Sequence, residues 1–175
     1  MNKKDIFWKL GYLAAAGAVF MIDQTSKAWA VRRLRFGDVR EIIPNFMNFA
    51  YAQNTGVAFS MFDSHGDAGR WGLSVVALAA GALVLYFFWR TPRTDDRILG
   101  ALALLLAGIA GNLTDRMRLG FVIDFIDVQL GSWHYPTFNV ADMAICIGAG
   151  LLILDMLLSK KKASALKVET KPAEN

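Results

Sequence analysis

The feature that most constrains this chain is an uninterrupted run, residues 71–89, that contains no charged side chain and is bounded by Arg70 and Arg90. A helix needs about 20 predominantly apolar residues to cross the hydrocarbon core of a bilayer. The run is close to that length, and soluble domains rarely contain so many consecutive apolar residues. We therefore predict a transmembrane helix over residues 71–89.

Three further segments have a similar character. Residues 98–114 are uncharged, and residues 138–158 are interrupted only by Asp142 and Asp155. Residues 10–31 form a weaker apolar segment. With 55% hydrophobic residues and a mean hydropathy of +0.35, the chain is more apolar than a soluble domain requires. The sequence thus predicts four transmembrane helices.

The first apolar segment has a second interpretation, because Lys3 and Lys4 before a short apolar stretch are also typical of a secretory signal peptide. Two observations favour a retained helix. Helix-compatible residues continue past Asp23 into residues 28–31, and no clean small-x-small cleavage site precedes Asp23. We therefore expect this segment to remain as the first transmembrane helix.

The distribution of basic residues predicts the orientation, since Lys and Arg in short flanking segments remain in the cytoplasm. One side collects three groups of basic residues: Lys3, Lys4 and Lys9; Arg90, Arg93 and Arg97; and Lys160, Lys161, Lys162, Lys167 and Lys171. The opposite side carries a smaller set, interleaved with acids: Arg32, Arg33, Arg35 and Arg40. Both termini are therefore predicted to lie in the cytoplasm, with residues 159–175 as a solvated, flexible tail.

The first outer loop, residues 32–70, is too long for a simple turn. Within it, residues 45–56 combine aromatic and β-favouring residues with an Asn-Thr-Gly turn signal. This pattern predicts a small sheet at the membrane surface. The predicted fold is an all-α integral membrane protein, a single domain of residues 1–158, with a small β-containing extracytoplasmic loop domain between its first and second helices.

Polar side chains gather at the outer ends of three predicted helices, where ionisable groups are costly and usually functional. They are Asp23, Asn112, Asp115, Arg116, Asn139 and Asp142. The second outer loop adds Asp124 and Asp127, each beside apolar residues. For any single acid, a salt bridge to Arg116 or Arg118 explains the residue equally well, but a cluster of this size favours a functional site.

A cluster of carboxylates suits acid–base hydrolysis of an amide. Two carboxylates held close together cannot both ionise easily, so one keeps a proton while the other can deprotonate water. A nearby asparagine or arginine can then hold the substrate carbonyl. The residues alone leave open which two of the acids form the pair: Asp23, Asp115, Asp124, Asp127 or Asp142.

Other chemistries find less support in the sequence. Ser26 and Lys27 are adjacent in a predicted helix and point in different directions, so they cannot form a Ser–Lys pair locally. His65 and His134 are isolated and lack metal-ligand spacing, and Cys146 lies within an apolar run. The net charge of +4 comes from basic residues between apolar segments, which indicates membrane topology rather than nucleic-acid binding.

The main alternative is a small proton- or cation-coupled membrane transporter subunit, in which intramembrane acids relay protons or bind cations. A transporter is expected to place polar residues through the full membrane thickness. Here the predicted inner halves are almost entirely apolar, apart from Asp155. A site at one face suits an enzyme better, and a pure scaffold has no need for so many buried acids.

Four motifs resemble those of the lipoprotein signal peptidase family, also called bacterial signal peptidase II. They are Asp23-Gln-Thr-Ser-Lys27, Asn54-Thr-Gly-Val-Ala-Phe59, Gly111-Asn-Leu-Thr-Asp-Arg116 continuing to Val122-Ile-Asp124-Phe125, and Phe138-Asn-Val-Ala-Asp142. Each motif is weak alone. Their order and their membrane positions make the resemblance specific, and it covers almost the whole chain.

The resemblance implies an intramembrane aspartyl endopeptidase that removes the signal peptide of prolipoproteins, cleaving before the cysteine that carries diacylglycerol. Asp124 and Asp142 match the family's catalytic pair, and Asp115 matches a structural position. The other matched positions line the site or support the substrate: Asp23, Lys27, Asn54, Gly56, Asn112, Arg116 and Asn139.

The resemblance also implies a multi-pass protein of the bacterial inner membrane, with its site near the extracytoplasmic face. We expect it to contact a diacylglyceryl-modified prolipoprotein and phospholipid, to act as a monomer, and to need no cofactor, metal or nucleic acid. The outer loop around Asn54 is expected to clamp the substrate and exclude water, with Phe59, Met61 and Phe62 contacting lipid.

Overall fold

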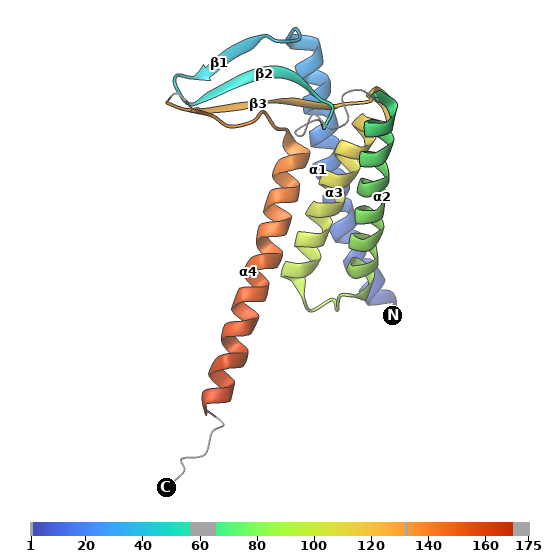
Figure 1. Cartoon of the computed structure of the whole chain (residues 1–175). Coiled ribbons are helices and arrows are strands. Elements are labelled where there is room, and N and C mark those ends of the chain that lie inside the picture. Colours follow the sequence, from blue (N-terminus) through green and yellow to red (C-terminus); the bar gives the residue numbers. More distant parts are fainter. Residues whose placement is uncertain (1, 57–65, 132, 170–175) are drawn as a thin grey trace.

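The computed structural model describes residues 2–56, 66–131 and 133–169, and four long helices run through them. They are α1 (Lys3–Arg33), α2 (Gly66–Arg90), α3 (Asp96–Leu119) and α4 (Val140–Glu169). Each is long and apolar enough to cross a membrane (Figure 1). The prediction of four such helices is confirmed, although each helix is longer than predicted.

The helices alternate in direction, so α1 begins and α4 ends on the same side of the bundle (Figure 1). We call this side the inner end, and the opposite side, where the strands lie, the outer end. The short connection between α2 and α3 is also at the inner end. The start of α1 and the end of α4 on one side agree with the predicted topology, while the assignment of that side to the cytoplasm stays a prediction.

Local sequence explains where several helices begin and end. α1 begins with a capping box, in which the Asp5 N–H donates to Asn2 Oδ1 at 2.9 Å and the Asp5 side chain accepts from the Asn2 N–H. α3 ends at Gly120, whose φ of 88° lies in the left-handed region that favours glycine. Both boundaries are marked by residues that are close together in the sequence.

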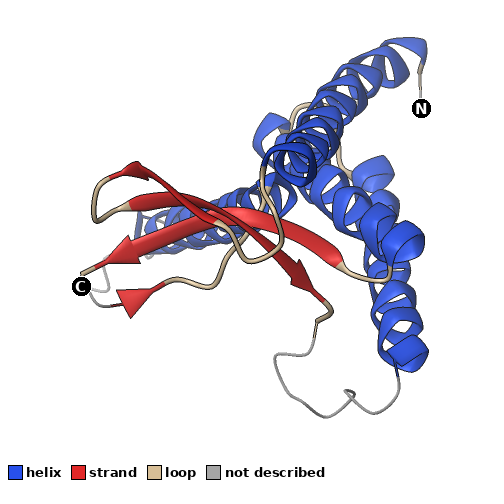
Figure 2. Ribbon diagram, turned by 90° about the horizontal axis from the view of Figure 1, so that it is seen from above, coloured by secondary structure: helices blue, strands red, loops and turns tan. Residues whose placement is uncertain are grey.

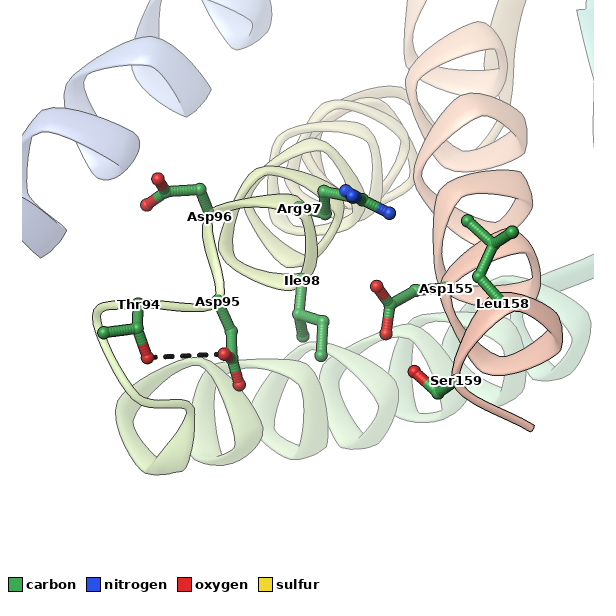
Figure 3. A pocket seen from close by; sticks show the side chains of 8 residues that line it. All are labelled: Thr94, Asp95, Asp96, Arg97, Ile98, Asp155, Leu158 and Ser159. Carbon is green, nitrogen blue, oxygen red and sulfur yellow. Dashed lines mark hydrogen bonds between the residues drawn. The ribbon is translucent and has the colours of Figure 1, made fainter. Parts of the chain in front are cut away.

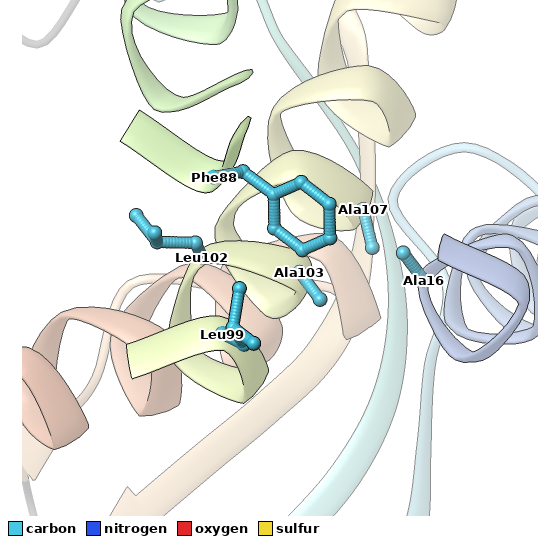
Figure 4. Close-up of a cluster of buried hydrophobic side chains, with 6 residues drawn as sticks. All are labelled: Ala16, Phe88, Leu99, Leu102, Ala103 and Ala107. Atoms are coloured by element: carbon cyan, nitrogen blue, oxygen red, sulfur yellow. The ribbon is translucent and has the colours of Figure 1, made fainter. Parts of the chain in front are cut away.

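The inner half of the bundle is held together by an apolar core (Figure 4). Phe88 of α2 and Leu99 of α3 are fully buried there. They pack with small and branched side chains of α1 and α3: Ala16, Leu102, Ala103 and Ala107. In lipid, helices associate through close packing rather than through removal of apolar surface from water. Small residues therefore stabilise this end by allowing the helices to approach.

Glycines extend this close packing to the contact between α3 and α4. A Cβ atom added at Gly148 of α4 would lie 2.7 Å from the carbonyl oxygen of Ala101 on α3. A Cβ atom at Gly108 of α3 would collide with the backbone of Ala141 on α4. Substitution at either position would push the two helices apart, and with them the polar groups at the outer end.

The outward-facing surfaces of the helices are apolar. Of the most apolar stretch of α2, only 11% is buried within the protein. The corresponding fraction for α3 is 50%. Val75, Leu83 and Ile153 are each more than half exposed. Such large exposed apolar surfaces are unfavourable in water and favourable in lipid. α3 is thus the central helix, and the others present much of their surface to the bilayer.

A four-stranded antiparallel sheet lies across the outer end of the bundle (Figure 1). Its strands, in spatial order, are β1 (Val39–Ile43), β2 (Met47–Asn54), β3 (Val122–Leu130) and β4 (Trp133–His134). Seen from above, the sheet extends to one side of the bundle, over α4 (Figure 2). The Cα atom of Ala52 pairs with that of Asp124, so β3 brings an acid beside the end of β2.

A second apolar cluster fixes the sheet to the bundle. Ala30 and Leu34, at the outer end of α1, are buried against Phe125 of β3. Phe49 of β2 packs on the same cluster, and its ring centre lies 5.0 Å from that of Trp29. These contacts set the height of β3 relative to the helices, and therefore the position of Asp124.

The predicted location of the sheet needs a correction. A small sheet was expected in the first outer loop, residues 32–70, and β1 and β2 confirm it. However, β3 and β4 come from the second outer loop, so the fold is not all-α apart from one loop domain. Residues 122–125 are buried on both faces of the sheet, which removes the alternation that identifies a strand in sequence.

The segment predicted to be a flexible tail, residues 159–175, begins within α4, which continues to Glu169. Lys, Ala and Leu, which dominate this segment, are strong helix formers. Extending an existing helix also avoids the unfavourable nucleation step. Residues 159–169 are therefore helical.

Candidate active site

The first turn of α4 places Asp142 at the outer end of the bundle. Asn139 lies just before the helix, and its N–H donates to Asp142 Oδ2 at 3.2 Å. In return, the Asp142 N–H donates to Asn139 Oδ1 at 3.0 Å. This reciprocal pair has the form of a capping box, which satisfies N–H groups that a helix start leaves free. A helix-start signal in the sequence thus fixes the orientation of this acid.

Asn139 also joins Asp142 to the acid on β3. Its Nδ2 donates to Asp124 Oδ1 at 2.7 Å, and the Nδ2 of Asn54, at the end of β2, donates to Asp124 Oδ2 at 3.0 Å. Asp124 is 1% exposed and Asn139 is fully buried. One buried asparagine therefore contacts both acids that the resemblance identified as the catalytic pair.

The turn after β2 determines which way the Asn54 amide points. Gly56 has a φ of 82°, a conformation that side chains other than glycine rarely adopt, and its N–H donates to Asn54 Oδ1 at 2.8 Å. The side-chain oxygen of Asn54 is thereby occupied, which leaves its side-chain NH₂ group to face Asp124. Gly56 thus acts on the site through Asn54.

α3 contributes Asn112 from the opposite side. Its Nδ2 donates to Asp142 Oδ1 at 2.7 Å. Its Oδ1 accepts from Asn139 Nδ2 at 3.2 Å and from Lys27 Nζ at 3.0 Å. Two donors on the carbonyl oxygen leave only one orientation for this amide, in which the NH₂ group faces Asp142.

Lys27 of α1 is buried beneath this network, with 2% of its surface exposed. Its Nζ lies 2.9 Å from both Asp23 Oδ2 and Asp115 Oδ2. Together with Asn112 these acceptors use all three N–H groups of the ammonium. A buried charge is tolerated only when it is paired and fully hydrogen-bonded, and here both conditions hold.

Asp23 and Asp115 hold neighbouring elements in place through their other contacts. Asp23 Oδ1 accepts the N–H of Ala141, in the first turn of α4, at 2.8 Å. Asp115 Oδ2 accepts the N–H of Ile123, at the start of β3, at 3.2 Å. Gly111 leaves room for this arrangement, since a Cβ atom there would lie 2.5 Å from Asp23 Oδ2. These two acids position the elements that carry Asp142 and Asp124.

The pKa of Asp124 is raised to about 6, chiefly by burial and also by the negative charge of Asp142. The hydrogen bonds from Asn54 and Asn139, and the charge of Lys27, act in the opposite direction without cancelling the effect of burial. A carboxyl group with this pKa can both hold and release a proton near neutral pH.

Arg116 is the second cation of the site. Within the part of the chain that the structure describes, it forms no salt bridge, and its buried Nε has no hydrogen-bond partner. The charges that act on it belong chiefly to Asp142, Asp124 and Asp115, in that order. A buried donor without a partner is costly in a resting protein, so this group is available for a ligand.

Some predicted residues lie elsewhere. Asp127, one of the five candidate acids, accepts from Asn48 Nδ2 at 2.7 Å and lies 3.3 Å from His134 Nδ1, away from the other four. Phe59, Met61, Phe62 and His65 lie outside the described residues. The suggested salt bridges from Asp115 or Asp124 to Arg116 or Arg118 are absent from the described ranges, because Lys27 is the cation that pairs with Asp115.

Sequence reasoning missed one residue of the network. Gln24 Nε2 donates to Asp23 Oδ2 at 3.1 Å, to Asp115 Oδ1 at 3.2 Å and to the carbonyl oxygen of Gly111 at 3.3 Å. The sequence offered one indication of its role, because Gln24 lies within the motif Asp23-Gln-Thr-Ser-Lys27. Side chains that bridge two helices are difficult to identify from sequence, because the partner helix is far away in the chain.

A cavity of about 690 Å³ lies at the inner end, between the start of α3 and residues 155–159 of α4 (Figure 3). It is lined by Thr94, Asp95, Asp96, Arg97, Ile98, Asp155, Leu158 and Ser159. Thr94 Oγ1 donates to Asp95 Oδ1 at 3.4 Å on one wall. None of the outer-end residues lines it, so this cavity is separate from the acid network.

Known proteins resemble this chain over most of its length. The sequence model of the family described as signal peptidase (SPase) II matches residues 15–158. A lipoprotein signal peptidase of Serratia proteamaculans is 40% identical over 165 residues, covering 94% of this chain and 97% of the relative. One from Pseudomonas fluorescens is 42% identical over 161 residues, covering 91% and 95%.

A solved structure described as a bacterial membrane enzyme, determined by the in meso method at 1.9 Å resolution, superimposes with a TM-score of 0.77. It is 30% identical and covers 84% of this chain and 92% of its own. The resemblance drawn from the four motifs is therefore confirmed. The chain belongs to the signal peptidase II family of lipoprotein signal peptidases, and it is a multi-pass bacterial membrane protease.

Proposed function

We propose that this protein is an aspartic endopeptidase that removes the signal peptide from diacylglyceryl-modified prolipoproteins, cleaving on the N-terminal side of the lipidated cysteine. One observation carries the proposal. Asn139, fully buried, donates to Asp124 through its side-chain amide and exchanges two backbone-to-side-chain hydrogen bonds with Asp142. Two acids tied to one rigid group can share a proton and activate water between them.

The raised pKa of Asp124 suggests which of the two acids acts as the general acid and which as the general base. Asp124, with a pKa of about 6, is the acid that holds a proton, which leaves Asp142 as the base. In the reaction, Asp142 takes a proton from water while the water oxygen forms a bond to the scissile carbonyl carbon. Asp124 gives its proton to the leaving amide nitrogen as the carbon–nitrogen bond breaks. The products are a free carboxyl group and an amine.

Arg116 and Asn54 supply candidate contacts to the substrate backbone. The unpartnered Nε of Arg116 is a donor suited to a peptide carbonyl near the acids. Asn54 already contacts Asp124 and lies at the end of β2, beside the site. Phe59, Met61 and Phe62, expected to contact lipid, lie outside the described residues, so the proposed clamp rests on Asn54 alone.

The position of the site suits a lipid-anchored substrate. All its residues lie at the outer end of the helices, beneath the sheet, and we assign this end to the extracytoplasmic face of the inner membrane. A diacylated cysteine embedded in that leaflet would present its scissile bond at the same level, next to phospholipid. Because one chain supplies the whole network, we propose that a monomer suffices, without cofactor, metal or nucleic acid.

The transporter alternative has less support. Its expected polar path through the membrane would cross the inner half of the bundle, where Phe88, Leu99 and Leu102 form an apolar core. The polar groups of the network stay at one level instead. No observation in the described residues favours transport over hydrolysis.

The test compares three purified full-length variants on a diacylglyceryl-modified prolipoprotein, with release of the signal peptide as the readout. Asp124→Asn and Asp142→Asn should fold and fail to cleave. Asp127→Asn is the matched control, since this acid lies on β3 outside the network, and it should cleave like the wild type. Cleavage by either of the first two variants at the wild-type rate would refute the proposed pair.

A further inference from the structure

Arg70, at the boundary of the uncharged run of α2, connects the start of that helix to the end of α3. Its Nε donates to the carbonyl oxygen of Arg116 at 2.9 Å, and its Nη2 donates to the carbonyl oxygen of Met117. Its guanidinium also lies 5.1 Å from the ring centre of Trp71. Arg70 is thus held at a defined position at the outer end.

The end of α3 is a place where such a side chain has a large effect. The last carbonyl groups of a helix have no partner within it, and they carry partial negative charge. Gly120 satisfies the Arg116 carbonyl once, through its N–H at 3.1 Å. Arg70 adds the second contact and extends to the next carbonyl. The planar fork of an arginine suits two successive acceptors, which a lysine cannot reproduce with equal geometry.

The packing around Gly120 shows that this contact is close. A Cβ atom added there would lie 3.6 Å from Arg70 Cδ and 3.9 Å from its Nε. Arg118 provides a contrast. It lies in the same last turn of α3, but its side chain is exposed and makes no hydrogen bond or salt bridge in the described part of the chain. The last turn of α3 is therefore held by Arg70 and not by Arg118.

Arg70 holds the backbone of Arg116. The side chain of Arg116 carries the buried Nε that has no hydrogen-bond partner among the described residues. We propose that Arg70 is a positioning residue for the proposed peptidase reaction, holding the backbone of Arg116 so that its guanidinium meets the substrate. The inference rests on the proposed function. Arg70 touches neither Asp124 nor Asp142, and its effect passes through Arg116.

A double-mutant cycle tests this dependence. We would measure kcat and KM for the full-length wild type, Arg70→Gln, Arg116→Gln and the double variant on a diacylglyceryl-modified prolipoprotein. Since small displacements of a positioning group are costly, we expect Arg70→Gln to lower kcat/KM by about tenfold or more. In the Arg116→Gln background the same change should have almost no effect, because the group it positions is gone.

Two further variants control for misfolding and for a general effect of positive charge. Arg70→Lys retains the charge and most of the stem, so it should fold even if Arg70→Gln does not, and it should recover only part of the lost kcat/KM. Arg118→Gln removes a cation from the same helix turn and should leave kcat/KM unchanged. Equal losses from Arg118→Gln would mean that general charge, and not the contact with Arg116, is responsible.

Hydrogen exchange gives a readout that does not depend on activity. In Arg70→Gln, the amide of Gly120 and the last turn of α3 should exchange faster than in the wild type, while the inner half of α3 should be unaffected. If the wild type cleaves but the effects of Arg70 and Arg116 simply add, the inference is wrong and the proposed function stands. If the wild type fails to cleave, both are wrong as statements about catalysis, and faster exchange would show only that Arg70 caps α3.

Discussion

The two halves of α3 differ in the side chains that they bury: apolar ones in the inner half and polar ones in the outer half. In its inner half, Leu99 and Leu102 pack against Phe88 in an apolar core. At the outer end, Asn112 and Asp115 belong to a network in which the buried side-chain atoms of the described residues are hydrogen-bonded, with the exception of Arg116 Nε. One helix thus serves both as an apolar support and as a carrier of polar groups.

The difference shows how a membrane protein can tolerate so many acids at one level. Each polar group at the outer end is costly in lipid unless it is paired. The network pairs almost all of them, with two cations, Lys27 and Arg116, facing four acids: Asp23, Asp115, Asp124 and Asp142. Acids outnumber cations, which favours a proton on one of them. The apolar inner end supplies the stability that this arrangement requires.

The membrane span of α4, Val140–Ser159, provides the test with the largest expected effect, because it carries one acid near its outer end, Asp142, and one near its inner end, Asp155. Asp142→Asn should lower kcat by about a thousandfold or more, since it removes the proposed base. Asp155→Asn changes an acid at the inner end, beside the cavity, and should leave kcat within about twofold of the wild type. The measurement is signal-peptide release from a lipidated substrate.

Equal losses in the two variants would remove the distinction between the ends. They would place the chemistry along the whole helix, as the transporter alternative requires. Circular dichroism of both purified variants would exclude the trivial explanation that one of them is unfolded.

The two buried lysines of α1 compare the ends in stability. Lys27 pairs with two carboxylates, whereas Lys9 donates to a single carbonyl oxygen, that of Trp89, at 2.7 Å. Lys27→Met leaves two buried acids uncompensated and should cost about 3–5 kcal/mol. Lys9→Met loses one charge-assisted hydrogen bond at the end of α2 and should cost about 1–3 kcal/mol. Unfolding in detergent micelles measures both, and a reversed order would contradict the pairing described here.

A cavity in the apolar core should separate stability from activity. Leu99→Ala removes a fully buried side chain at the inner end and should cost about 2–5 kcal/mol of unfolding free energy. Because no polar group of the network contacts Leu99, kcat per folded molecule should not change. A fall in kcat without a change in KM would show that the inner core also sets the geometry of the acids.

The smallest expected effect concerns pH. If Asp124 must be protonated, kcat/KM should decline as pH rises through the pKa of about 6. The Asn54 amide stabilises the ionised form of Asp124, so its hydrogen bond lowers this pKa. Asn54→Ala should therefore raise the pKa and move the alkaline decline to higher pH by a fraction of a unit.

The Asn54 variant also tests the proposed clamp. A lower kcat/KM at the optimal pH would support a contact between Asn54 and the substrate. An unchanged turnover would contradict it, whereas an unchanged pH profile would show that Asp124 is not the group that limits the reaction at high pH. Asn48→Ala is a suitable control, because this asparagine donates to Asp127 in the same sheet but outside the network.

Much of the fold was predictable because the sequence signals were local. Residues 71–89 are uncharged over the length of a membrane span, and α2 lies there. β3 was not predicted, because residues 122–125 are all buried and show no alternation of buried and exposed side chains. The helical continuation of α4 was missed because Lys-rich segments are usually solvated, although their helix propensity is high.

The candidate site divides in the same way. The capping pair of Asn139 and Asp142 is encoded within one helix turn, so a sequence motif can identify it. The pairing of Lys27 with Asp115, and the contacts of Gln24, join residues that are far apart in the chain. No local pattern specifies such partners, so the role of Arg70 at the end of α3 was equally hidden.

The sequence by itself therefore determined the four membrane helices, the gathering of acids at one end and, through four short motifs, the family. Hydrophobic length, charge placement and helix-start signals are properties of neighbouring residues, and they persist whatever the rest of the chain does. Only the tertiary structure decided that Asp124 shares Asn139 with Asp142, and that Lys27 belongs to Asp23 and Asp115. Such pairings depend on how closely the helices approach, which glycines at the contacts between helices permit.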